Sequence, residues 1–219
     1  MSNTSNGPAL KGSKMWMQKL VEEKSDFLNK DLEDTLKWIS PCKPYYKEFQ
    51  LNNLEICKKL GISQDVFKKY WPSRQPQWDG IAVGEKGTLY LFEAKSHKSE
   101  ISSSKKGKSE ENNKQKYDTI MCTASEWFNI NNPDEALKKI WCEKYFQISN
   151  RISFCRLMQE NTNYHTVVVF LNFVNDSTWK EKRVTSEKDW ENHYGKIFED
   201  MKITTNRNDI KIINFDLNK

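Results

Sequence analysis

The sequence predicts an α/β sandwich in which helices cover a mixed central β-sheet. Three observations support this class. Residues 80–95 alternate like a β-hairpin around a turn at Gly84–Gly87. Residues 165–174 form a nearly continuous apolar run, which is typical of a strand covered on both faces. Residues 143–160 and 186–201 repeat apolar side chains at helical spacing. Strands and helices therefore alternate along the chain.

The composition fits one globular domain with a substantial core. The chain has 219 residues, eight of them tryptophan, and a net charge of +5. This charge allows nucleic-acid binding without establishing it. Five cysteines without a C-x-x-C pair indicate neither a zinc site nor a disulfide framework. No apolar run approaches the roughly 20 residues that span a bilayer. We therefore expect a cytoplasmic protein with no membrane partner.

The N-terminal part predicts helices that precede the hairpin. Residues 1–14 are polar, with glycine and proline, and are expected to form a disordered tail before a single domain at 15–219. Apolar residues at helical spacing over 15–39 predict two helices or one long helix. Residues 45–60 favour a helix that stops at Gly61, and Ser63 is expected to cap a short helix that runs to Tyr70.

The part after the hairpin predicts a mobile loop and then alternating elements. Residues near 98–113 are polar and rich in lysine, which predicts the loop. Helices are expected at 114–128, 133–141 and 143–160. Ser186 and Asp189 predict a capping box for the helix at 186–201, and residues 210–215 predict the last strand.

The hairpin carries a cluster of charges. Alternation places Glu93 and Lys95 on one face of the second strand, and the hairpin turn returns Asp79 to the level of Glu93. Two adjacent carboxylates repel each other unless a cation compensates, and Mg²⁺ prefers such oxygen ligands. Asp79, Glu93 and the carbonyl of Ala94 are therefore candidate metal ligands. Lys95 is expected to orient or deprotonate the attacking water, or to stabilise charge on the phosphate oxygens. The alternative is an ordinary ion pair at a strand end.

These residues resemble the motif of the PD-(D/E)xK nuclease superfamily. Asp79 corresponds to the first acid, Glu93 to the second and Lys95 to the lysine. Over roughly residues 40–216 the chain also resembles a bacterial family with a Pro-Gln-Trp-Asp segment, a strand ending Glu-Ala-Lys-x-His and a Tyr-Gln-x-x-Asn-Arg-like helix, although Phe146 interrupts that last pattern. The resemblance implies a restriction endonuclease-like α/β/α sandwich with extra N-terminal helices.

The resemblance also directs attention to polar residues outside the hairpin. On the helix at 143–160, Gln147, Asn150 and Arg151 share a face by helical spacing, and this polar cluster either hydrogen-bonds the core or faces the hairpin site. In the second case, which the resemblance favours, Gln147 is expected to position a catalytic water, and Asn150 and Arg151 to contact phosphate. His97 and Lys98, just after the strand, are expected to contact nucleic acid, or else to be ordinary surface residues. In the superfamily a helix before the hairpin can add an acid. The candidates here are Glu48 and Glu55, each of which could equally be a solvated glutamate.

The function expected from the resemblance is that of a metal-dependent nuclease. Its cofactor would be Mg²⁺, with Mn²⁺ as the alternative, and DNA is favoured over RNA as substrate. The other hypothesis is a catalytically silent or partner-dependent nucleic-acid-binding protein of a defence or repair system. No separate recognition module is evident, so a homodimer or a protein partner is expected to supply any specificity.

Overall fold

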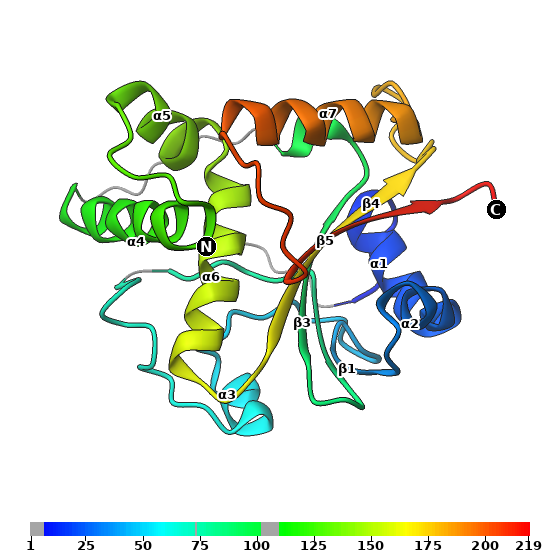
Figure 1. The fold of residues 1–219 in the computed structure, drawn as a ribbon. Helices are drawn as coiled ribbons and strands as arrows, with labels where there is room; N and C mark the ends of the chain where they lie inside the picture. The colour runs from blue at the N-terminus through cyan, green and yellow to red at the C-terminus, as the bar shows by residue number, and fades with distance from the viewer. Residues whose placement is uncertain (1–6, 73, 102–109) are drawn as a thin grey trace.

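The computed structural model describes residues 7–72, 74–101 and 110–219. A β-sheet separates two layers of helices, which Figure 1 shows nearly edge-on. Helices α1 and α2 lie on one face, and α4, α6 and α7 lie on the other. Their bounds are Gly12–Glu23 for α1, Ser25–Leu32 for α2, Glu110–Phe128 for α4, Phe146–Asn161 for α6 and Glu187–Asp200 for α7. The predicted α/β class is therefore confirmed.

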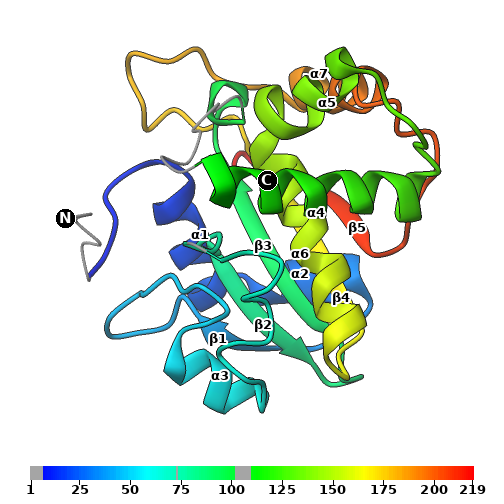
Figure 2. The same ribbon diagram turned by 90° about the vertical axis from the view of Figure 1, so that its left-hand side faces the viewer.

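The sheet has five strands in the order β1-β2-β3-β4-β5. The first three strands pair antiparallel, and β4 and β5 each pair parallel with the strand before them. Figure 2 shows the sheet from its broad side. The sheet is therefore mixed, as predicted. Its strands are β1 (Leu36–Ser40), β2 (Gly80–Gly84), β3 (Leu89–Lys95), β4 (Thr166–Val174) and β5 (Ile210–Asp216).

Strand alternation divides the apolar side chains between two cores. Leu89 and Leu91 pack with α4, α6 and α7, whereas Tyr90 and Phe92 pack with α1 and α2. Strand β4 is buried along its whole length and contributes to both cores. This arrangement confirms the predicted faces of the hairpin and the doubly covered strand.

The prediction of helix throughout residues 15–39 is wrong at its C-terminal end. After α2 the chain takes a left-handed conformation at Glu33, and the N–H of Leu36 donates to Oδ1 of Asn29. The chain then forms β1 at the edge of the sheet. The apolar spacing of this segment is compatible with a helix, but pairing with β2 decides its structure. Helix α1 also begins within the expected tail, at Gly12.

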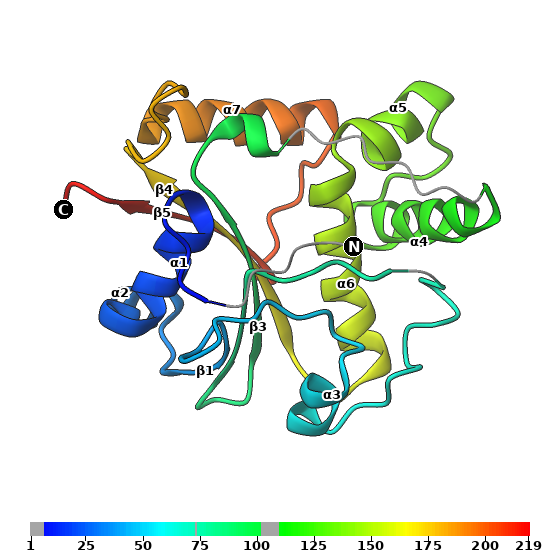
Figure 3. The same ribbon diagram turned by 180° about the vertical axis from the view of Figure 1, so that it is seen from behind.

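The segment before the hairpin contains less helix than predicted. Only α3 (Leu54–Leu60) is helical, and it ends at Gly61 in the left-handed conformation. Phe49 instead forms an isolated bridge with Trp78, which places this segment against the start of the hairpin. Residues 64–70 form turns rather than a helix. Figure 3 shows α3 at the opposite end of the molecule from α7.

The second half of the chain follows the prediction closely. Ser186 and Asp189 form the capping box of α7. Asp134 caps α5 (Glu135–Lys139), and a π-helical turn, η2 (Ile140–Lys144), leads into α6. Within the expected mobile loop, Lys98–Glu100 form the 3-10 turn η1, and residues 102–109 lie outside the described residues. None of the helices described has the length and apolar character needed to cross a membrane.

Candidate active site

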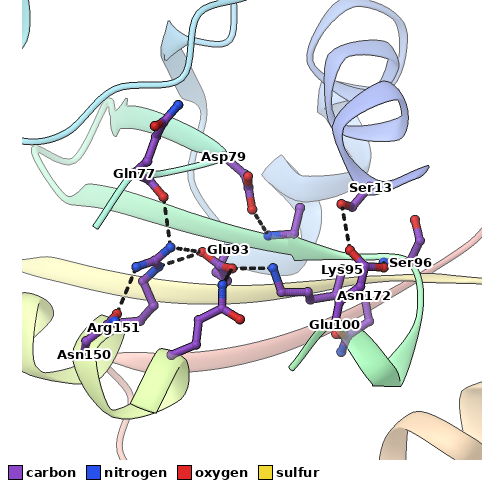
Figure 4. A network of polar contacts seen from close by, with 12 residues as sticks. Ser13, Gln77, Asp79, Glu93, Lys95, Ser96, Glu100, Asn150, Arg151 and Asn172 are labelled. Atoms are coloured by element: carbon purple, nitrogen blue, oxygen red, sulfur yellow. Dashed lines mark hydrogen bonds and ion pairs between the residues drawn. The ribbon is translucent and has the colours of Figure 1, made fainter. Parts of the chain in front are cut away.

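The end of the hairpin ladder positions Asp79 opposite Glu93. Gly80, the first residue of β2, pairs with Phe92, and the N–H of Asp79 just before it donates to the carbonyl of Phe92. Beyond that point, Oδ2 of Asp79 accepts the N–H of Ala94 at 2.7 Å (Figure 4). The side chain of Asp79 thus takes the place of a backbone acceptor on the neighbouring strand. The predicted juxtaposition of the two acids is therefore present.

Glu93 is the centre of the cluster and is only 2% exposed. Its Oε1 accepts hydrogen bonds from Nζ of Lys95 and, at 2.7 Å, from Nε2 of Gln147. Its Oε2 accepts one from Nε of Arg151 at 2.6 Å, and Nη2 of Arg151 lies 2.6 Å away (Figure 4). A carboxylate offers about four acceptor positions, so these neighbours fill those of Glu93.

Arg151 points into this cluster rather than toward solvent. Its Nη2 donates to the carbonyl of Gln77 and its Nη1 to Oδ1 of Asn150, each at 2.9 Å. The guanidinium also lies 4.9 Å from the ring centre of Trp78. Arg151 and Asn150 are each 6% exposed. In this structure Arg151 neutralises Glu93 and Asn150 orients Arg151, and the expected contacts of both residues with phosphate stay a prediction.

Burial and charge shift the protonation of the two acids in opposite directions. Burial, together with the charge of Glu93, raises the pKa of Asp79 to about 8. Burial also opposes ionisation of Glu93, but Arg151 and Lys95 outweigh it and hold the pKa of Glu93 below its usual value. Glu93 is therefore the ionised partner of two cations, while Asp79 keeps its proton at neutral pH unless a further cation binds.

Glu48 is the candidate third acid that lies near this cluster. Its carboxylate pairs with Lys14 at 3.2 Å and accepts from Nε2 of Gln77 at 3.1 Å. Its charge also contributes to the raised pKa of Asp79. Glu55 instead lies in the first turn of α3, half exposed, and pairs with Lys59 at 3.0 Å. No contact among the described residues links Glu55 to the site.

His97 and Lys98 have different environments from each other. The side chain of His97 is 3% exposed, and its Nε2 lies 3.9 Å from Oδ2 of the buried Asp176. His97 is therefore an interior residue rather than a surface group. Lys98 is exposed and pairs with Asp189 at 3.3 Å.

The oxygen ligands at the site are of the type that a hard cation prefers, but they are too few to form a complete metal site by themselves. Within the described ranges, no group of three or more His, Cys, Asp and Glu side chains could hold a metal ion. Two carboxylates are nevertheless present, and Oδ1 of Asp79 accepts no hydrogen bond from a described residue. Oε1 of Gln147 is also buried without a partner among these residues. A cation bound to Glu93 must displace one of its present donors.

Sequence reasoning missed several residues that build the site. Gln77 and Trp78 hold Arg151, and their place in the Pro-Gln-Trp-Asp segment was the available signal. Asn172 pairs with Lys95 in the sheet register and accepts the hydroxyl of Tyr194 at 3.3 Å. The presence of an asparagine inside an otherwise apolar strand was the available signal for Asn172.

Three comparisons with known proteins bear on the identity of the chain. Comparison of the chain with protein-family models, with curated proteins and with solved structures found no match. The resemblance to the PD-(D/E)xK superfamily therefore rests on the motif residues alone.

Proposed function

We propose that the chain is a metal-dependent phosphodiesterase that cleaves nucleic acid, with DNA favoured over RNA. The observation that carries the proposal is the position of Asp79 level with Glu93 on adjacent strands, with Lys95 in contact with Glu93. A phosphate-binding role alone gives no reason to bury two acids side by side, since burial beside Glu93 raises the pKa of Asp79 to about 8. A divalent cation gives such a reason.

The order of the elements also supports the proposal. Helices and the edge strand β1 come first, then the hairpin with the acids, then α4, α5 and α6, then β4 parallel to β3. This is the order implied by the restriction endonuclease-like fold. Helix α6 lies between β3 and β4 in the chain and directs Gln147 and Arg151 at Glu93. The elements that bear the candidate residues therefore converge on one place.

Each residue has a role in this proposal. Asp79, Glu93 and the carbonyl of Ala94 would hold Mg²⁺ or Mn²⁺, which would activate a water and stabilise charge on the phosphate. The carbonyl of Ala94 lies beyond the last pair of the β2–β3 ladder, so β2 does not occupy it. Lys95 would stabilise the phosphate oxygens, and the unpartnered Oε1 of Gln147 would orient the attacking water.

The saturated carboxylate of Glu93 favours a second candidate function. Because Lys95, Gln147 and Arg151 already satisfy Glu93, the cluster is stable without a metal. A nucleic-acid-binding protein that does not cleave, or that cleaves only with a partner, would not need a metal ion in this cluster. The two candidates differ in whether a divalent cation can displace a donor from Glu93.

A cleavage assay separates these candidates. Plasmid, linear duplex, single-stranded DNA and RNA are incubated with Mg²⁺, Mn²⁺ or EDTA. The proposal predicts metal-dependent cleavage that is lost in Lys95→Ala and Asp79→Ala. Glu55→Gln, an exposed glutamate away from the site, should cleave like wild type. Cleavage that persists in Lys95→Ala or in EDTA would contradict the assigned site, and no cleavage of any substrate would favour the second candidate.

A further inference from the structure

The loop between β4 and α7 carries a group of positive charges. Lys180, Lys182 and Arg183 lie in it, all exposed, with the exposed Glu181 among them, and Lys11 and Lys98 approach it from elsewhere in the chain. We call the five basic residues the cationic surface. Figure 1 shows the loop in orange above α1, and Figure 3 shows the same neighbours from behind.

Trp179 organises the cationic surface. The Nζ atoms of Lys11 and Lys182 lie 3.9 and 5.0 Å from the centre of the Trp179 ring. The N–H of Gly12 donates to Oγ1 of Thr178 at 2.9 Å, which fixes the loop against α1. A Cβ atom at Gly12 would lie only 2.5 Å from Nε1 of Trp179, so the contact is close. The ring therefore holds two ammonium groups in place.

Most of these charges lack an anionic partner within the protein. Lys98 pairs with Asp189, but in the described part of the chain Lys11, Lys180, Lys182 and Arg183 form no ion pair with a carboxylate. Lys182 and Arg183 also line a hollow of about 210 Å³ together with Lys98. Gathered cations repel one another, so an external polyanion would be favoured here.

A short chain of contacts links the cationic surface to the candidate active site. Oε1 of Glu100 accepts the N–H groups of Ser96 and His97 at 3.0 and 2.8 Å, and Ser96 directly follows Lys95. The other oxygen of Glu100 accepts Oγ of Ser13, at 3.4 Å, in the first turn of α1. Lys11 lies two residues before Ser13. The surface therefore flanks the end of β3 that bears Lys95.

We infer that the cationic surface binds the phosphate backbone of duplex DNA beside the cleavage site. The inference rests on the nucleic-acid substrate of the proposed function. Proteins that bind single strands usually stack bases on aromatic rings. Here two ammonium groups already lie over Trp179, the aromatic ring of the surface, which favours contacts to phosphates over contacts to bases. Phosphate contacts without base contacts suit a duplex.

The test is a binding titration in EDTA, where no metal-dependent cleavage occurs. A labelled duplex is titrated with wild type, with the double variant Lys182→Ala/Arg183→Ala, and with Lys58→Ala/Lys59→Ala. The last pair removes the same charge from exposed positions on α3, at the far end of the molecule. At about 0.1 M salt we expect the first pair to weaken binding roughly 10- to 100-fold and to reduce the salt slope by about 2. The control pair should change little.

Equal weakening by both pairs would overturn the inference, because charge alone and not this surface would then matter. An unchanged affinity for the duplex in the Lys182→Ala/Arg183→Ala variant would overturn it too. Failure of the proposed function has a different signature. If wild type binds the duplex through this surface but never cleaves it with metal, the phosphodiesterase proposal fails and the binding surface stands.

Discussion

Arg151 and Glu93 form a buried ion pair in which Nε and Nη2 of the arginine both lie 2.6 Å from Oε2 of the glutamate. The pair joins α6 to β3, and its two residues lie 58 positions apart in the chain. Arg151 thus supplies part of the positive charge that two neighbouring acids require. Metal binding at Glu93 would have to compete with it.

Removal of Arg151 should strongly destabilise the metal-free protein. Arg151→Met leaves the carboxylate of Glu93 buried with Lys95 as its remaining cation, and breaking a buried pair in this way typically costs about 3–5 kcal/mol. Urea denaturation in EDTA measures the loss. Arg74→Met removes an exposed arginine with a single 3.4 Å side-chain contact and should stay within about 0.5 kcal/mol of wild type. Similar losses in both variants would contradict the importance of the ion pair.

Gly80 should accommodate a side chain only at a cost in stability, because the hairpin lies close to α1 at this residue. A Cβ atom there would lie 2.3 Å from Cε of Met17 and 3.3 Å from Cβ of Phe92. Gly80→Ala is therefore expected to reduce the free energy of unfolding by about 1–3 kcal/mol. Gly195→Ala is the matched control, since Gly195 lies in α7 with no atom within 4 Å of the added carbon.

The control substitution should have the opposite sign. An exposed glycine inside a helix is less favourable than alanine by roughly 0.5–1 kcal/mol, so Gly195→Ala should raise the free energy of unfolding. Thermal or urea unfolding of the two variants against wild type checks both expectations. Equal effects of the two substitutions would show that the close packing of α1 on β2 is absent in solution.

Asp200 should make stability depend on pH below about 4. Hydrogen bonds from Lys144 at 2.7 Å and from Tyr145 at 2.6 Å lower the pKa of Asp200 from 3.8 to about 2. A lowered pKa means that its stabilisation is present above about pH 4 and is lost as the pH falls toward 2. Because the carboxylate lies near solvent, we expect Asp200→Asn to cost no more than about 1 kcal/mol at pH 7.

The difference between this variant and wild type should shrink as the pH falls from 4 to 2.5 and should vanish only below about pH 2, where the carboxyl group is protonated in both the folded and the unfolded chain. Urea denaturation at pH 7, 4 and 2.5 measures this convergence. A difference between wild type and Asp200→Asn that does not shrink with falling pH would mean that Asp200 does not tie α7 to the η2 turn through its charge.

The parts of the fold that were predictable are those fixed by local pattern. The hairpin at β2 and β3 has alternating side chains and a glycine-containing turn, and α7 has both members of its capping box. Strand β1 could not be recognised, because its apolar residues also fit a helix and only pairing with β2 distinguishes the two. Residues 45–53 gave the same ambiguity, which the bridge of Phe49 to Trp78 resolves.

The site was predictable to a similar extent. Asp79, Glu93 and Lys95 lie together because of the alternation along β3 and the hairpin turn. Alternation and turn formation depend on residues close in sequence, so this part of the site was predictable. The helical spacing of Gln147 and Arg151 predicted a shared direction for them. The partner of Arg151 was not predictable, because it depends on how α6 docks against the sheet, and the burial of His97 against Asp176 depends likewise on tertiary packing.

The central claim is that Asp79 and Glu93 hold a divalent cation, and titration with Mn²⁺ tests it most directly. Isothermal titration of wild type should show one or more saturable Mn²⁺ sites that are absent in Asp79→Ala and retained in Glu55→Gln. Saturable binding lost only in the Asp79 variant is the result that we predict. Wild-type protein that binds no Mn²⁺ or Mg²⁺, or equal binding by Asp79→Ala, would contradict the claim.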